Sequence, residues 1–148
     1  MNAEVNQIVF GDRNGDRMIL EITDRMHPDA DDYWDGNWLS VTLDVVAGPW
    51  RGATGIGLHL CELQTMRERL RDAYQHLDRK VVFTPMENDF SLEFVGDGRG
   101  HVTIRGTARD AIGTGEISFS YHLDQTYLPG LIAQIKNVED SFPVVGRR

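Results

Sequence analysis

The feature that most constrains the fold of this chain is an alternation of apolar and polar side chains that recurs over most of its length. In the clearest case, residues 39–45, Leu and Val alternate with Ser, Thr and Asp. This two-residue period is that of a half-buried β-strand, whose successive side chains point to opposite faces. The pattern predicts about seven or eight strands, over residues 5–10, 17–23, 39–45, 54–60, 81–83, 90–94, 102–109 and 116–123.

Only two segments, residues 62–77 and 125–138, change to the helical period of 3.6 residues. The connections between the predicted strands are short, as at Asn14-Gly15, and therefore favour antiparallel pairing over parallel crossovers. The predicted fold class is thus α+β, an antiparallel β-sheet with two helices packed on it. No linker and no internal repeat is visible in the sequence, so we expect one domain over residues 1–148.

The charge narrows the class of partner. The chain has 15 Lys and Arg against 23 Asp and Glu, a net charge of −8, and a pI near 5.0. Phosphate backbones and anionic membranes repel such a protein, so we expect neither nucleic acid nor membrane as a partner. A basic protein partner is favoured instead, although the same charge also serves solubility alone. The sequence carries no signal for an oligomeric state.

Cys61 is the only cysteine, and the chain opens without a basic segment followed by an apolar run. We therefore expect a cytoplasmic protein without a disulfide or a signal peptide. The sequence has no P-loop, no Gly-x-Ser-x-Gly motif and no His-Glu-x-x-His motif. We accordingly predict no catalytic residue, no metal and no cofactor.

Three histidines support an alternative function of another class. His59, His101 and His122 fall on the polar phase of predicted strands. If those strands were neighbours, the imidazoles would converge and the protein would be a metal-binding or small-ligand-binding protein or an enzyme. Cys61 lies two residues after His59, at a spacing that suits a nucleophile and its base, although a buried inert cysteine is the favoured interpretation.

Residues 24–35 contain five aspartates and no apolar period, which predicts a loop, and Trp34 and Trp38 lie at its end. Tryptophan is frequent at binding hot spots, and carboxylates attract a basic partner. The predicted partner contacts are Asp29, Asp31, Asp32, Trp34 and Asp35. The structural alternative is that residues 35–38 only form a turn, with Trp38 and Trp50 in the core and Trp34 covering an edge.

Two stretches of the sequence are similar to a known family. They are the residues Asp-Tyr-Trp-Asp-Gly-Asn-Trp-Leu at 32–39 and Asp-Gln-Thr-Tyr-Leu at 124–128, the second followed by Phe142-Pro143, with Glu62-Leu63 and Met86-Glu87 between them. This combination resembles the WapI-type immunity proteins, a family of small bacterial cytoplasmic proteins, from about residue 8 to residue 143. The resemblance implies a non-enzymatic protein that binds and neutralises a cognate contact-dependent toxin, such as a nuclease-type toxin domain. It transfers no catalytic residue.

Overall fold

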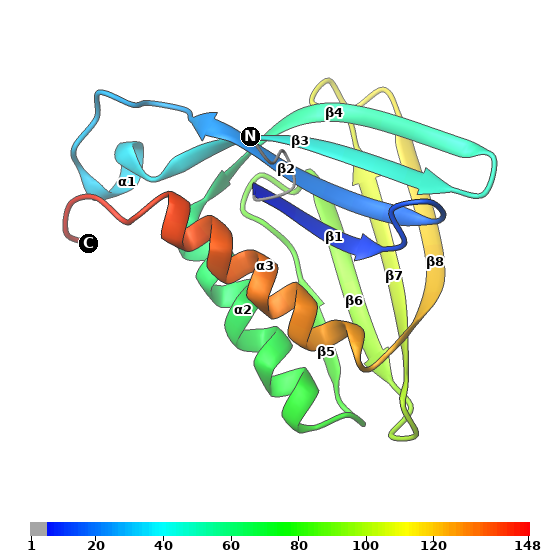
Figure 1. Ribbon diagram of the computed structural model, residues 1–148. Helices are drawn as coiled ribbons and strands as arrows, with labels where there is room; N and C mark the ends of the chain where they lie inside the picture. The colour runs from blue at the N-terminus through cyan, green and yellow to red at the C-terminus, as the bar shows by residue number, and fades with distance from the viewer. Residues whose placement is uncertain (1–5) are drawn as a thin grey trace.

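The computed structural model describes residues 6–148 and arranges eight strands in two antiparallel sheets of four (Figure 1). The first sheet contains, in spatial order, β1 (Gln7–Gly11), β2 (Arg17–Arg25), β3 (Trp38–Ala47) and β4 (Trp50–His59). The second contains β5 (Lys80–Phe83), β6 (Phe90–Gly96), β7 (His101–Arg109) and β8 (Glu116–Asp124). The predicted α+β class and antiparallel pairing are confirmed. Val5, predicted to begin the first strand, lies outside the described residues.

The two long helices are α2 (Leu60–Gln75) and α3 (Tyr127–Ser141). Both helices were predicted, and each observed start differs from its prediction by two residues. The predicted loop 24–35 is shorter in the structure, because β2 continues to Arg25 and a short helix, α1 (Tyr33–Gly36), forms before β3. Within residues 6–148, no helix is both long and apolar enough to cross a membrane.

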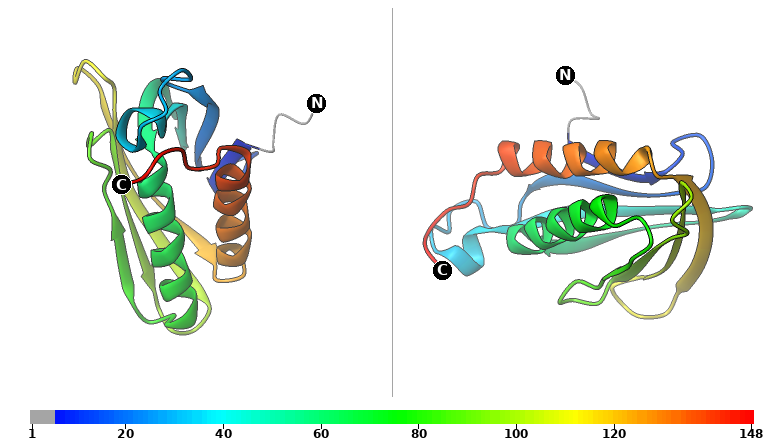
Figure 2. Two further views of the ribbon diagram at one scale, coloured as in Figure 1. Left: turned by 90° about the vertical axis from the view of Figure 1, so that its left-hand side faces the viewer. Right: turned by 90° about the horizontal axis from the view of Figure 1, so that it is seen from below.

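The two halves of the described chain repeat one order of elements, four strands followed by a long helix (Figure 1). Each helix lies beside the first strand of the other half, α3 beside β1 and α2 beside β5. The two helices lie side by side in every view (Figure 2) and are joined by an ion pair between Arg67 and Glu139, with Nε and Oε2 2.5 Å apart. The sequence showed no repeat, because the halves share the order of their elements rather than their residues.

A single buried cluster joins both sheets and both long helices. The alternation read from the sequence determines which side chains enter it, since Leu39, Val41, Leu43 and Val45 of β3 are all buried. Contacts between the sheets include the rings of Phe10 on β1 and Phe94 on β6, whose centroids are 6.0 Å apart. The sheets therefore provide a rigid support, from which the connection between β2 and β3 projects (Figure 1).

Candidate functional site

The acidic loop, defined here as residues 27–36, connects β2 to β3 and includes α1. It carries all the predicted contact residues, and Asp29, Asp31, Asp32 and Asp35 are exposed. Trp34 is 46% exposed. Within residues 6–148, none of the four carboxylates forms an ion pair. The loop thus presents four carboxylates outside ion pairs beside an aromatic ring, and the role of these residues as contacts stays a prediction.

The backbone of the acidic loop is ordered by its own residues. The Asp32 carboxylate caps α1 by accepting a hydrogen bond from the Asp35 backbone N–H at 3.0 Å. Asparagine is an equally good N-cap, because its side-chain oxygen accepts the same bond. An Asp32→Asn change therefore removes the charge and keeps the cap.

Asn37 fastens the acidic loop to segment 142–148, which runs back from α3 toward α1 (Figures 1 and 2). Its buried side-chain amide donates to the carbonyl oxygens of Tyr33 at 2.7 Å and Val145 at 2.8 Å. Its Oδ1 accepts from the Val145 N–H at 2.9 Å. Gly146 has a φ of +71°, and a Cβ there would lie 2.6 Å from the Tyr33 nitrogen, so only glycine allows this close approach.

Arg25, at the end of β2, makes a second connection between the same segments. Its guanidinium donates to the Gly36 carbonyl oxygen at 2.8 Å and also to that of Pro143, and it lies over the Phe142 ring at 5.9 Å. It also donates a longer hydrogen bond, of 3.5 Å, to the Asn37 side-chain oxygen Oδ1, and none of its hydrogen bonds goes to an aspartate of the acidic loop. Arg25 and Asn37 together are called the clip below.

His59 is completely buried and packs against the acidic loop. Its Nδ1 accepts a hydrogen bond from the Cys61 N–H at 3.1 Å, so the ring proton is on Nε2. Nε2 lies 3.2 Å from the carbonyl oxygens of both Tyr33 and Trp34 and donates to them. One imidazole thus caps α2 and holds the backbone of α1. The Glu62 side chain accepts a hydrogen bond from the His59 backbone N–H at 3.0 Å, so the two residues form a capping box at the start of α2.

This arrangement does not suit a nucleophile activated by a base. His59 Nδ1 is already used by the Cys61 backbone N–H, so it is not free to accept a proton from the Cys61 thiol. Burial, followed by the nearby Glu62 charge, raises the pKa of that thiol above its ordinary value. Both effects favour the neutral thiol, which is a poor nucleophile.

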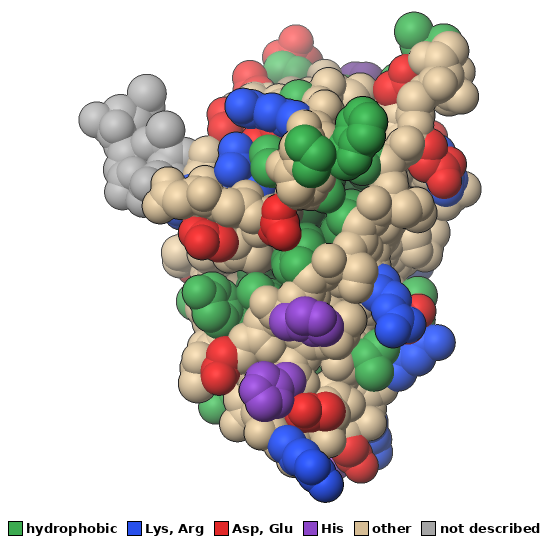
Figure 3. Space-filling model, turned by 90° about the vertical axis from the view of Figure 1, so that its right-hand side faces the viewer, with side chains coloured by type: hydrophobic (Ala, Val, Ile, Leu, Met, Phe, Trp, Pro, Cys, Tyr) green, Lys and Arg blue, Asp and Glu red, His purple; other side chains and the backbone are tan. Residues whose placement is uncertain are grey.

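The structure brings only two of the three predicted histidines onto one face. His59 is in the first sheet and buried, whereas His101 on β7 and His122 on β8 are exposed on the second sheet. Figure 3 shows two histidine side chains close together on one exposed face. His101 pairs with Asp97 at 3.0 Å, and His122 Nδ1 lies 3.1 Å from the Thr103 hydroxyl. The possible convergence of all three histidines is therefore wrong, and residues 6–148 contain no group of three side chains placed to hold a metal ion.

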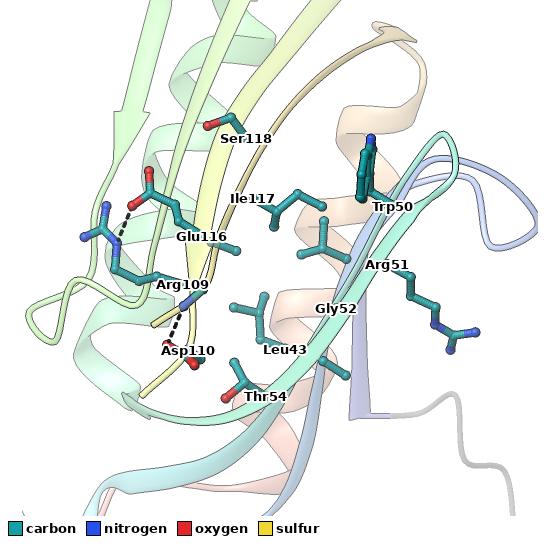
Figure 4. A pocket seen from close by; sticks show the side chains of 14 residues that line it. Leu43, Trp50, Arg51, Gly52, Thr54, Arg109, Asp110, Glu116, Ile117 and Ser118 are labelled. Carbon is teal, nitrogen blue, oxygen red and sulfur yellow. Dashed lines mark hydrogen bonds and ion pairs between the residues drawn. The ribbon is translucent and has the colours of Figure 1, made fainter. Parts of the chain in front are cut away.

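A separate apolar groove of about 560 Å³ lies between β4 and the β7–β8 hairpin. Figure 4 shows Leu43, Trp50 and Ile117 turned toward it, with Arg51 pointing away. Trp50 is 71% exposed, so the alternative that placed it in the core is wrong. Trp38 is half-buried and stands edge-on to His59, with ring centroids 5.3 Å apart.

Sequence reasoning located the acidic loop but not its supports. The supporting roles of Arg25, His59 and segment 142–148 were missed, because each acts on residues distant in sequence. The one available signal was the occurrence of residues 32–39 and Phe142-Pro143 in the same resemblance, since the structure brings those two stretches together.

The model of the Immunity protein WapI-like family matches residues 8–143. The chain belongs to this family. Membership implies a role in toxin immunity and a cognate toxin as partner. The family match spans β1 to the end of α3, together with the acidic loop.

Among solved structures, a chain from the crystal structures of Trypanosoma brucei MRP1/MRP2 has a TM-score of 0.50 and 9% sequence identity. The alignment covers 93% of this chain and 84% of that chain. At this identity the likeness shows a shared fold alone. A search of curated proteins found no match.

Proposed function

We propose that this WapI-like family member neutralises its toxin by binding it directly, and that the acidic loop contacts a basic surface of the toxin. The observation that carries the proposal is a set of four exposed carboxylates that have no ion-pair partner among residues 6–148 and lie beside an exposed tryptophan. Family membership supports the toxin as partner. Neutralisation by binding requires no catalysed reaction by the protein itself. We further propose that the protein acts in the cytoplasm.

The support beneath the acidic loop favours binding. A loop that is ordered before it meets its partner loses little conformational entropy on association. The clip and His59 order the acidic loop, because they donate hydrogen bonds to the backbone carbonyl oxygens of residues 33, 34 and 36. The exposed carboxylates are therefore presented on a rigid surface, where they accelerate encounter with a basic partner and orient it.

The test replaces Asp31, Asp32 and Asp35 together by asparagine. The toxin is first captured from a lysate of the source species that expresses it, and its purified domain is then titrated against each variant. Exposed charge pairs contribute about 0.2–1 kcal/mol each, so we expect affinity to fall about 10-fold at low salt. The salt dependence of binding should become flatter, because fewer charges remain to be screened.

A matched control removes three exposed charges from other surfaces, by Asp12→Asn, Glu68→Gln and Asp78→Asn. This control has the same net charge as the loop variant, so it separates local contact from overall charge. Both variants should unfold at the same temperature as the original protein within a few degrees. Equal affinity of the loop variant and the control would refute the assignment of the acidic loop.

A further inference from the structure

Arg148 places its guanidinium over the two aromatic rings of α1. Its Cζ atom lies 5.5 Å from the ring centroid of Trp34 and 6.0 Å from that of Tyr33. At these distances the electron-rich face of a ring attracts a cation. In the described part of the chain, Arg148 forms no ion pair with a carboxylate.

The two rings form a preformed surface. Tyr33 and Trp34 meet edge to face, with centroids 5.2 Å apart and planes at 84°. Both rings also pack against the buried imidazole of His59, at 5.3 and 5.1 Å between centroids. His59 in addition bonds the carbonyl oxygens of both residues, which restricts the backbone that carries the rings. The rings therefore stay in place whether or not a cation lies on them.

We propose that Tyr33 and Trp34 form a seat for an arginine side chain of the toxin, and that Arg148 occupies this arginine seat until the toxin displaces it. The inference rests on the proposed function, because the toxin is taken as the source of the arginine. Arginine is favoured over lysine, since the planar and weakly hydrated guanidinium stacks on aromatic faces more readily than an ammonium group. The carboxylates of the same loop attract the incoming cation from a distance.

Arg148 is suited to the role of a displaceable occupant. Segment 142–148 is anchored at Val145, three residues earlier, by two hydrogen bonds to Asn37. Loss of the Arg148 contact therefore leaves the clip intact. An exposed cation–π contact is weak, so the internal arginine competes only mildly with an external one. Removing it should strengthen binding of an external arginine by about two- to fivefold.

The probe is a tetra-arginine peptide, titrated into the full chain while NMR follows the indole N–H signals of the tryptophans. The Trp34 signal should move on titration, whereas that of Trp50, on β4 and 71% exposed, serves as an internal reference. Arg148→Ala is compared with Arg147→Ala, which removes the same charge from the next residue. Tetra-lysine carries the same charge as tetra-arginine and tests the preference for guanidinium.

The expected result is tighter binding of tetra-arginine to Arg148→Ala than to the original chain or to Arg147→Ala, and weaker binding of tetra-lysine. Equal effects of the two alanine variants would overturn the proposal, because general repulsion would then explain them. Equal binding of the two peptides would overturn it too, since charge alone would suffice. The experiment contains no toxin, so its failure is distinct from failure of the proposed function, which the aspartate variants test.

Discussion

Replacement of Asn37 by alanine is expected to release segment 142–148 from the acidic loop. The Asn37 side chain makes three short hydrogen bonds of 2.7, 2.8 and 2.9 Å, two of them to Val145 and one to the Tyr33 carbonyl oxygen, and it accepts a longer one of 3.5 Å from Arg25. A net contribution of about 0.5–1.5 kcal/mol for each of the three short bonds gives about 1.5–4.5 kcal/mol in total. Water replaces the two bonds to Val145 once the segment lifts, and His59 still donates to Tyr33. We therefore expect a loss of about 2–3 kcal/mol.

Urea unfolding measures this loss directly. With a slope of about 2 kcal/mol per molar, the midpoint should fall by about 1–1.5 M. Hydrogen exchange gives a local measurement, because the Val145 N–H donates to Asn37 Oδ1. That amide should lose its protection in the variant, while core amides of β3 keep theirs in conditions where the protein remains folded.

Asn137→Ala is the matched control, because Asn137 is exposed on α3. It should change the free energy of unfolding by less than about 0.5 kcal/mol. The reasoning is refuted if Asn37→Ala leaves both the midpoint and the protection of the Val145 amide unchanged. The hydrogen bonds of Asn37 would then contribute nothing to holding segment 142–148 against α1.

Two further predictions concern the packing of the two sheets. Phe94→Ala removes a buried ring that contacts Phe10 across the sheets, and it should lower the free energy of unfolding by about 3–5 kcal/mol in urea titrations. Tyr121→Phe removes a hydroxyl that donates to the Phe10 carbonyl oxygen at 2.5 Å, which should cost about 1 kcal/mol at pH 7. Burial raises the pKa of Tyr121 above its ordinary value of 10.0, so the stability contributed by the neutral phenol is present below pH 10 and lost as the pH rises further. The stability difference between Tyr121→Phe and the original protein should therefore narrow in unfolding measurements above pH 10, and a constant difference would refute this assignment.

The strands were predictable because their signal is local. A half-buried strand alternates its side chains with a period of two residues, and the segments 39–45 and 90–94 carry that period without interruption. The division into two sheets was not predictable in the same way. The helix α2 lies between β4 and β5 and carries the chain from one sheet to the other. The helical period predicts that helix, but whether the strands before and after it pair with one another depends on contacts distant in sequence.

The helix starts differ from the predictions for identifiable reasons. Histidine is an uncommon N-cap, so the pattern did not indicate that His59 begins α2 at Leu60. Asp124, directly before the predicted helix 125–138, is of a residue type that often caps a helix, but its carboxylate accepts from the Thr126 N–H in a turn, and α3 begins at Tyr127. In both cases the start of the helix depends on which backbone N–H a single side chain accepts from, which the periodicity does not indicate.

The candidate site separates the residues that support it from the residues that it exposes. The clip and His59 bond backbone carbonyls of the acidic loop, so the support does not depend on the side chains at 29, 31 and 35. Those three positions are exposed and lie outside the buried cluster. Substitution there changes the charge that a partner meets and leaves the loop backbone in place. Under the proposed function, substitution at these positions would change the specificity for a toxin without loss of the fold that presents them.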